Sequence, residues 1–161
     1  MTKLLEVGDK APSFALKNQK EEIVNLSDFL GRKVLVYFYP KAMTPGCTVQ
    51  ACSLRDTIED FKKQDVEILG ISIDPPKRLA KFIERDELNF TLLSDEDHAI
   101  AELYGVWGEK KFMGKVYDGI HRISFLIDEN GHIMHVFDNF KTNNHHQVIL
   151  DFLAEQNSQN A

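Results

Sequence analysis

A continuous apolar run followed by a loop between two prolines constrains the fold of this chain more than any other feature. Residues 34–39 are all apolar and rich in branched and aromatic side chains, which is typical of a buried strand. Pro40 and Pro45 bracket the following loop, and apolar residues then recur at helical spacing as far as Lys63: Ala51, Leu54, Ile58 and Phe61. This order of strand, loop and helix predicts one unit of an α/β fold.

The rest of the sequence continues this alternation. Residues 66–73 form a second apolar run, and Pro75-Pro76 end it before an amphipathic helix. The other predicted elements are a hairpin-like region at 12–26, a strand at 90–93, a helix at 99–104 before Gly105, strands at 123–127 and 132–137 joined by an Asn130-Gly131 turn, and a closing helix from Asn143-Asn144. We therefore predict an α/β protein with a central mixed β-sheet flanked by helices.

Composition sets limits on size and partners. The 161 residues are 43% hydrophobic and 10% aromatic, enough for one compact domain, which we place at 1–155 before a polar tail at 156–161. The 19 basic and 25 acidic residues give a net charge of −6, so we expect no nucleic-acid partner. No apolar run approaches the roughly 18 residues of a membrane helix, and the N-terminus soon turns acidic. We expect no membrane association and a cytoplasmic location.

The two cysteines are too few for a disulfide scaffold, and the first falls at the start of a predicted helix. Thr44 can serve as the N-cap and Pro45 suits the first helical position, so Cys47 occupies the third. Unpaired amides and the helix dipole favour negative charge there, and we expect the Cys47 thiol to ionise more readily than a free cysteine. Cys47 also shares the buried line of the helix with Ala51.

The residues alone leave other interpretations of these cysteines open. A free cysteine is most often a small buried hydrophobe, although a loop of proline, threonine and glycine around Cys47 is a costly choice for packing alone. Cys52 follows five residues later, about 140° around the helix, where packing and reactivity fit equally well. In an intact helix the two Cα atoms would be roughly 8.6 Å apart, so a disulfide requires unwinding. Two cysteines supply half of a structural zinc site, and we expect no metal.

The loop resembles the peroxiredoxin signature Pro-x-x-x-Thr-x-x-Cys, formed here by Pro40, Thr44 and Cys47. With Cys52 five residues on, it is similar to the bacterioferritin-comigratory-protein, or Q, subfamily. The similarity covers nearly the whole chain, including residues 9–14, 34–56, 94–95, 105–110 and 121–128. The subfamily often has glutamate where this chain has Gln50, a departure that leaves the signature intact, and we assign Gln50 no role.

The resemblance implies a thioredoxin-like fold and a thiol peroxidase, with Cys47 as the peroxidatic and Cys52 as the resolving cysteine. Hydrogen peroxide and organic hydroperoxides would be reduced to water and alcohols through a sulfenic acid and a Cys47–Cys52 disulfide, which thioredoxin or a similar dithiol donor would reduce. Thr44 would help to hold the peroxide, Arg122 would place positive charge beside the thiolate, and Pro40 would shield the sulfur. No cofactor and no metal are implied.

An enzyme of this kind would protect against oxidative stress. Because both cysteines lie on one chain, catalysis does not require a dimer, and we expect a monomer. The alternative is a non-enzymic thiol redox sensor or binding switch, in which the disulfide changes surface contacts. A sensor has no need of a threonine and an arginine arranged about a leaving oxygen, so the residues favour the enzyme.

Three segments outside the cysteine loop carry simpler expectations. His145-His146 and the pair His132 and His135 are expected to be solvated rather than to bind metal, because their spacings point the side chains apart. Residues 95–97 predict a solvated turn and a helix start. Residues 107–114 are interpreted as a glycine-bounded aromatic loop that either borders the substrate channel or caps the core.

Overall fold

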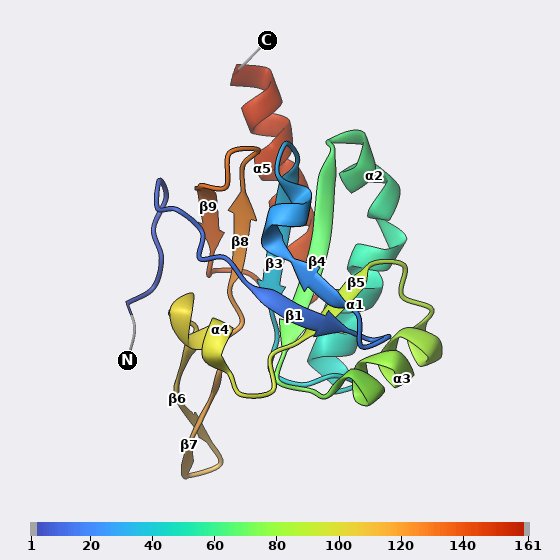
Figure 1. Ribbon diagram of the computed structural model, residues 1–161, viewed down its shortest axis with the longest axis vertical. Helices are drawn as coiled ribbons and strands as arrows, with labels where there is room; N and C mark the ends of the chain where they lie inside the picture. Colours follow the sequence, from blue (N-terminus) through green and yellow to red (C-terminus); the bar gives the residue numbers. More distant parts are fainter. Residues whose placement is uncertain (1–2, 160–161) are drawn as a thin grey trace.

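The computed structural model describes residues 3–159, which form a seven-stranded mixed sheet with helices on both faces (Figure 1). In the order β2-β1-β5-β4-β3-β8-β9, its strands are Ile23–Asn25, Ala15–Asn18, Thr91–Ser94, Val66–Ser72, Lys33–Phe38, Ser124–Ile127 and Ile133–Phe137. The helices are α1 (Pro45–Asp56), α2 (Ile58–Lys63), α3 (Pro76–Asp86), α4 (Ala99–Leu103) and α5 (His145–Gln159), with a 3-10 turn at Leu26–Phe29. A separate two-stranded sheet holds β6 (Trp107–Phe112) and β7 (Lys115–Ile120).

The centre of the large sheet is parallel and its two sides are antiparallel. Strands β3, β4 and β5 run parallel, and these are the strands predicted from the apolar runs. Strands β8 and β9 continue the sheet antiparallel on one side, and β1 and β2 do so on the other. The Asn130-Gly131 turn joins β8 to β9, and Gly131 takes the left-handed φ of 86° that favours glycine. The predicted α/β class with a mixed sheet is confirmed.

Alternate side chains of β3 enter two hydrophobic cores on opposite faces of the sheet. Leu35 and Tyr37 lie in the core that α1, α2, α3 and α5 cover, whereas Val36 and Phe38 lie in the core beneath α4 and the N-terminal segment. The chain leaving β3 leads into α1 and places Cys47 in the first core. Cys47 therefore lies near the carboxyl end of a parallel strand, where open α/β sheets usually bind ligands.

The helix predicted to run through Lys63 is divided in two, so this prediction is wrong. Helix α1 ends at Asp56 and α2 begins at Ile58. Between them, Thr57 has φ −113° and ψ 16°, and its hydroxyl donates to the carbonyl oxygen of Ser53 at 2.7 Å. A hydroxyl that bonds a carbonyl one turn back competes with the helical backbone pattern. Helix α1 is consequently a separate helix of 12 residues.

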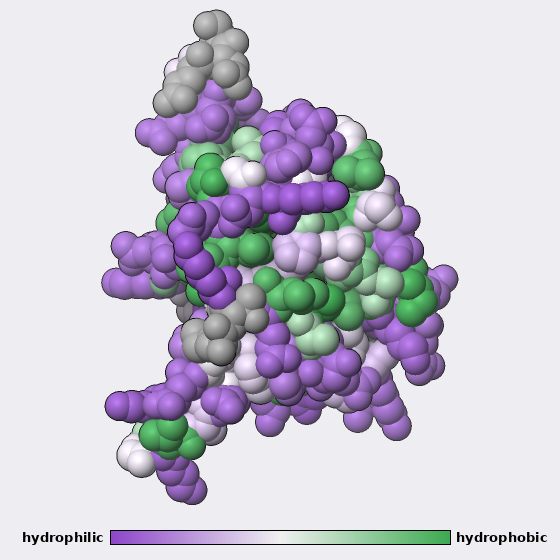
Figure 2. Space-filling model, turned by 60° about the vertical axis from the view of Figure 1, so that its left-hand side comes forward, coloured by the Kyte–Doolittle hydropathy of each residue, from purple (hydrophilic) through white to green (hydrophobic). Residues whose placement is uncertain are grey.

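Residues 107–114 are not a loop but strand β6 and the turn of its hairpin with β7. Trp107 packs against the second core and stacks on His98 with ring centroids 3.9 Å apart. The outer part of the hairpin projects from the body (Figure 1), and Figure 2 shows a small hydrophobic spot among hydrophilic residues on this projection. The hairpin exposes four large apolar side chains, those of Phe112, Met113, Val116 and Tyr117, and Met113 is 86% exposed. Because solvent reaches both faces, the hairpin lacks the alternation that identifies a strand in a sequence.

Asp95 is buried rather than solvated, although the helix start predicted beside it is present as α4. Its carboxylate accepts hydrogen bonds from the backbone N–H groups of Ile100 at 3.2 Å and Ala101 at 2.8 Å. Burial raises the pKa of Asp95, and these two hydrogen bonds oppose the rise. Glu96 and Asp97 are exposed, as expected.

Helix α5 continues to Gln159 and so extends into the segment predicted as a polar tail. Residues 160–161 of that tail, like residues 1–2 of the predicted acidic N-terminus, lie outside the described part of the chain. None of the helices within residues 3–159 combines the length and the apolar character needed to span a bilayer.

Candidate active site

Cys47 is buried in the first turn of α1, at the position predicted for it. Thr44 is the N-cap, Pro45 is the first helical residue and Cys47 the third, with 2% of its surface exposed. Gly46 lies between Pro45 and Cys47, and a Cβ atom at this position would come within 3.4 Å of Nη2 of Arg122. The missing side chain lets the guanidinium approach the first turn of the helix. A thiol, a helix N-terminus and a fixed cation are thus brought together.

The Arg122 side chain contacts Cys47 and Gln50 with the same nitrogen. Arg122 lies just before β8, and its Nη1 donates to Cys47 Sγ at 3.3 Å and to Gln50 Oε1 at 2.6 Å. Gln50 is fully buried and lies three residues after Cys47 on α1, so both side chains meet the guanidinium on one helix face. The sequence interpretation gave Gln50 no role. Its three-residue spacing from Cys47 was the available signal.

Thr44 and Pro40 lie in the loop between β3 and α1. The Thr44 hydroxyl does not cap the helix but donates to the carbonyl oxygen of Lys41 at 2.8 Å. The Thr44 carbonyl accepts the first helical bond, from the N–H of Thr48 at 2.9 Å. Pro40 is half-buried where the chain leaves β3. Within residues 3–159, neither Pro40 nor Thr44 makes a hydrogen bond to the sulfur, whereas Arg122 does.

Lys110 is a second cation close to this cluster. It lies on β6, and its Nζ donates to the carbonyl oxygen of Ile120 on β7 at 2.8 Å. Burial lowers the pKa of Lys110, the Arg122 charge lowers it further, and the Cys47 thiolate opposes both. The β6–β7 hairpin therefore places a half-buried lysine beside the thiol and the guanidinium without a hydrogen bond to the sulfur.

Cys52 lies on the same helix but in different surroundings. Both cysteines are free thiols, and Cys52 is half-buried whereas Cys47 is buried. Burial raises the pKa of Cys52, Arg55 opposes the rise, and the carboxylates of Asp86 and Asp56 add to it. The intact helix α1 separates the two cysteines as the helical repeat requires, at a Cα distance of roughly 8.6 Å. The structure is that of the dithiol form.

His145 is fully buried behind the site, so the expectation that it is solvated is wrong. It is the first residue of α5, and its Nε2 lies 2.7 Å from Oγ of Ser124 on β8. Its ring also packs against Tyr37 and Phe140, with centroids 5.7 and 4.5 Å away. Burial, and then the charge of Arg122, lower the pKa of His145 to about 3. A neutral imidazole therefore fastens α5 to the strand that follows Arg122.

The remaining histidines do not converge on a common site. Within residues 3–159, no three histidine, cysteine, aspartate or glutamate side chains are grouped as a metal site would require. His132 is exposed, and His135 stacks on Phe152 with centroids 4.5 Å apart.

Comparison with known proteins gives consistent matches along the chain. The model of the AhpC/TSA family matches residues 7–136. Peroxiredoxin Bcp of Escherichia coli strain K12 is 66% identical over 151 residues, which cover 94% of this chain and 97% of the relative. Peroxiredoxin Bcp of Bacillus subtilis strain 168 is 43% identical over 151 residues, covering 94% and 96%.

Solved structures agree with the sequence relatives. Peroxidoxin BcpB from Mycobacterium tuberculosis superposes with a TM-score of 0.83 at 33% identity, covering 94% of this chain and 97% of that one. A Xanthomonas campestris bacterioferritin comigratory protein, described for its alkyl peroxide reduction activity, has a TM-score of 0.83 at 29% identity and covers 89% and 91%. The Xylella fastidiosa PrxQ structure has a TM-score of 0.88 at 26% identity, covering 94% and 97%.

We expect His145→Gln to reduce the loss of stability at acid pH. Because the pKa of His145 is lowered from 6.5 to about 3, the unfolded chain takes up a proton in this interval that the folded protein excludes. The contribution of His145 to the free energy of unfolding is therefore complete above pH 6.5, the pKa in the unfolded chain. It falls as the pH is lowered, by about 2 kcal/mol between about pH 7 and 5. Urea unfolding at the two pH values measures the change.

The exposed His132 supplies the control for this measurement. His132→Gln should lose as much stability between the two pH values as the wild-type protein, and His145→Gln should lose about 2 kcal/mol less. The comparison concerns the pH dependence and not the absolute stability, because the substitution also alters the contact with Ser124. Equal pH dependence in all three proteins would contradict the burial of a neutral imidazole.

Proposed function

Because this chain belongs to the peroxiredoxins of the AhpC/TSA family and is a thiol peroxidase, we propose that Cys47 is its peroxidatic cysteine. The observation that carries this assignment is the 3.3 Å contact from Arg122 Nη1 to Cys47 Sγ in the first turn of α1. A fixed cation and a helix N-terminus both favour the thiolate, which is the nucleophilic form. Cys52 lies beyond the first turn of α1, and burial raises its pKa despite the opposing charge of Arg55.

The first step transfers one oxygen atom to the Cys47 sulfur. The thiolate attacks one peroxide oxygen, the O–O bond breaks, and the leaving hydroxide or alkoxide takes a proton to become water or an alcohol. Cys47 becomes a sulfenic acid, so the sulfur loses two electrons and the peroxide gains two. The Arg122 guanidinium stabilises the thiolate before the attack and the charge on the leaving oxygen during it.

Thr44, Pro40 and Gln50 prepare the site for that step. The Thr44 hydroxyl donates a hydrogen bond to the backbone carbonyl oxygen of Lys41. Its own oxygen is therefore left to accept a hydrogen bond from the peroxide O–H. The first amides of α1 supply donors to the peroxide oxygens. Gln50 holds Arg122 toward the sulfur through the 2.6 Å bond, and Pro40 shields the sulfur from water. The peroxide is then held in line for displacement.

The second step forms a disulfide and requires α1 to unwind. The Cys52 sulfur attacks the sulfenic sulfur of Cys47, an S–S bond forms, and the sulfenic oxygen leaves as water. In the helix the two thiols are too far apart for this bond, and burial raises the pKa of the Cys52 thiol. Unwinding brings the sulfurs together and exposes Cys52 to water, which restores its ordinary acidity.

The cycle closes when a dithiol donor reduces the Cys47–Cys52 disulfide. We assign this step to thioredoxin or a similar donor, whose two thiols become a disulfide as the two cysteines of this chain are restored. The substrates are hydrogen peroxide and organic hydroperoxides, and the role is protection against oxidative stress. With both cysteines on one chain, a single copy of the domain at 1–155 is the catalytic unit, and we propose a monomer.

The setting that suits this cycle is a reducing compartment, and we propose the cytoplasm. No cofactor is needed, because the oxidant is the substrate and both electron donors are thiols. The net charge of −6 argues against nucleic acid as a partner. A purely non-enzymic redox switch is excluded by the family, since the chain is a peroxidase.

We expect Cys47→Ser to abolish peroxide consumption with thioredoxin and its reductase, whereas Cys52→Ser still reacts once. The reason is that only Cys47 lies against Arg122 at the helix start, so only Cys47 forms the sulfenic acid. Without Cys52 this acid cannot close the disulfide that thioredoxin reduces efficiently. Oxidation of reduced nicotinamide cofactor by the reductase measures turnover, and a sulfenic-acid reagent measures the single oxidation.

The two readouts separate the parts of this proposal. Sustained turnover by the wild-type protein supports thioredoxin as the donor, whereas a single oxidation without turnover means that another reductant is required. If both variants lost the first oxidation equally, the assignment of different roles to the two cysteines would be wrong.

Arg122→Ala should slow the oxidation of Cys47 by about a hundredfold, because it removes the donor at the sulfur and at the leaving oxygen. Lys110→Ala is the matched control, because Lys110 lies near the cluster without bonding the sulfur. Stopped-flow oxidation measures both variants, and a rate in Arg122→Ala equal to that in Lys110→Ala would refute the role of the contact between Arg122 and Cys47.

Oxidation to the disulfide should increase hydrogen exchange in α1. Amides from residues 49–55 are expected to be protected in the dithiol form and to exchange faster in the disulfide form, because the helix must open for the bond to form. Residues 66–72 of β4 serve as the internal control and should not change. Equal protection of 49–55 in both forms would contradict the geometry, and a covalent dimer on a gel without reductant would then indicate a disulfide between chains.

A further inference from the structure

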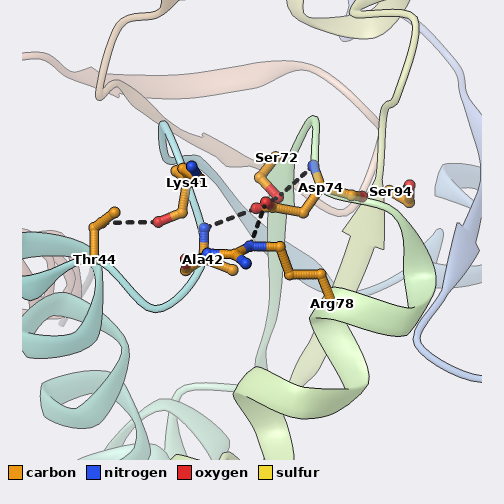
Figure 3. Close-up of polar contacts among 7 residues, drawn as sticks. All are labelled: Lys41, Ala42, Thr44, Ser72, Asp74, Arg78 and Ser94. Carbon is orange, nitrogen blue, oxygen red and sulfur yellow. Dashed lines mark hydrogen bonds and ion pairs between the residues drawn. The ribbon is translucent and has the colours of Figure 1, made fainter.

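The loop between β3 and α1 is held by two charged side chains from the next strand–helix unit of the sheet (Figure 3). Asp74 Oδ2 accepts a hydrogen bond from the backbone N–H of Ala42 at 2.7 Å. Arg78 Nη2 donates to the carbonyl oxygen of the same residue at 2.8 Å. The two side chains form an ion pair, with Arg78 Nε 3.1 Å from Asp74 Oδ1. We call Asp74 and Arg78 the loop clamp.

The clamp is itself fixed in place. Asp74 is only 5% exposed, and its Oδ2 also accepts from the hydroxyl of Ser72 at 2.8 Å. The backbone carbonyl of Asp74 accepts from Ser94 Oγ on β5 at 2.7 Å. A buried carboxylate with this number of partners has little freedom to move. The clamp therefore fixes the backbone of Ala42, which is fully buried, relative to β4 and β5.

The residues after Ala42 form a tight turn that ends at Thr44. Met43 has a left-handed φ of 65°, a conformation that residues other than glycine seldom adopt. The Thr44 hydroxyl completes the turn by bonding the Lys41 carbonyl, on the other side of Ala42. Figure 3 shows this bond beside the contacts of the clamp on the same loop. Any shift of Ala42 would consequently turn the Thr44 hydroxyl.

We propose that Asp74 and Arg78 are positioning residues of the peroxidase, which act on the peroxide through the orientation of Thr44. The inference rests on the proposed function in one respect, that the Thr44 oxygen accepts a hydrogen bond from the peroxide. Neither side chain of the clamp hydrogen-bonds Cys47, so the clamp leaves the reactivity of the sulfur itself unaltered. A purely structural role would instead affect every reaction of Cys47.

Two reactions of Cys47 separate these roles. Peroxide attack uses the sulfur and Thr44, whereas alkylation by iodoacetamide uses the sulfur without the Thr44 hydroxyl. We expect Arg78→Ala to lower the rate of Cys47 oxidation by about tenfold, because a small displacement of a positioning group has a large kinetic effect. Alkylation should stay within about twofold of the wild-type rate. Asp74→Asn should change the two rates in the same way. Because Arg78 is 37% exposed, we expect Arg78→Ala to fold.

Lys77 and Thr44 supply the controls. Lys77→Ala removes an exposed charge next to Arg78 on α3 and should leave both rates unchanged. Thr44→Val should slow oxidation on its own, and adding Arg78→Ala to it should slow oxidation by less than about twofold more, because the clamp acts through the residue already removed.

The outcomes distinguish failure of the inference from failure of the proposed function. If Thr44→Val oxidised as fast as the wild-type protein, the proposed role of Thr44 would fail, and the inference with it. If Thr44→Val were slow but Arg78→Ala resembled Lys77→Ala, only the clamp would be refuted. Equal losses of oxidation and alkylation in Arg78→Ala, or fold-changes that multiply in the double variant, would also overturn the positioning role.

Discussion

The guanidinium of Arg122 lies 3.3 Å from the Cys47 sulfur. This contact requires two distant parts of the chain to meet at the carboxyl end of β3. Cys47 arrives from β3 through a short loop, and Arg122 arrives from the segment that enters β8. Because β3 and β8 are paired antiparallel, the end of one strand lies beside the start of the other. The sheet thus brings the cation to the helix start, and Gly46 leaves room for it.

The local part of the site was predictable from the sequence, and its long-range part was not. The N-cap position of Thr44 and the burial of Cys47 follow from residues within one helical turn and are confirmed, although the Thr44 hydroxyl bonds Lys41 and not the helix. The contact of Arg122 with Gln50 joins residues 72 positions apart and depends on strand register. Only the resemblance to a known family pointed to Arg122. His145 was misjudged because a polar residue at a helix start is buried or exposed according to what packs over it.

The difference between local sequence signals and tertiary contacts also explains which elements of the fold were predicted. The parallel strands were predicted because burial on both faces leaves a continuous apolar run. The β6–β7 hairpin was missed because solvent reaches both of its faces and removes the pattern. The division of the helix at Thr57 was missed because the apolar spacing continues across it, from Leu54 to Phe61. Apolar periodicity indicates which face of a helix is buried. It does not indicate that the Thr57 hydroxyl bonds the backbone and ends the helix.

In the proposed cycle, peroxide attack needs a rigid site and disulfide formation needs a mobile one. The two demands fall on adjacent segments. The loop before α1 is held by the buried carboxylate of Asp74 and by Arg78. Helix α1 is held more lightly on its outer side, where Arg85 bonds the Thr48 hydroxyl at 2.8 Å and Asn89 bonds the Arg55 carbonyl at 3.2 Å. A helix of 12 residues has little stability of its own, and the break at Thr57 separates it from α2, so the opening that the proposed disulfide requires does not need α2 to unfold.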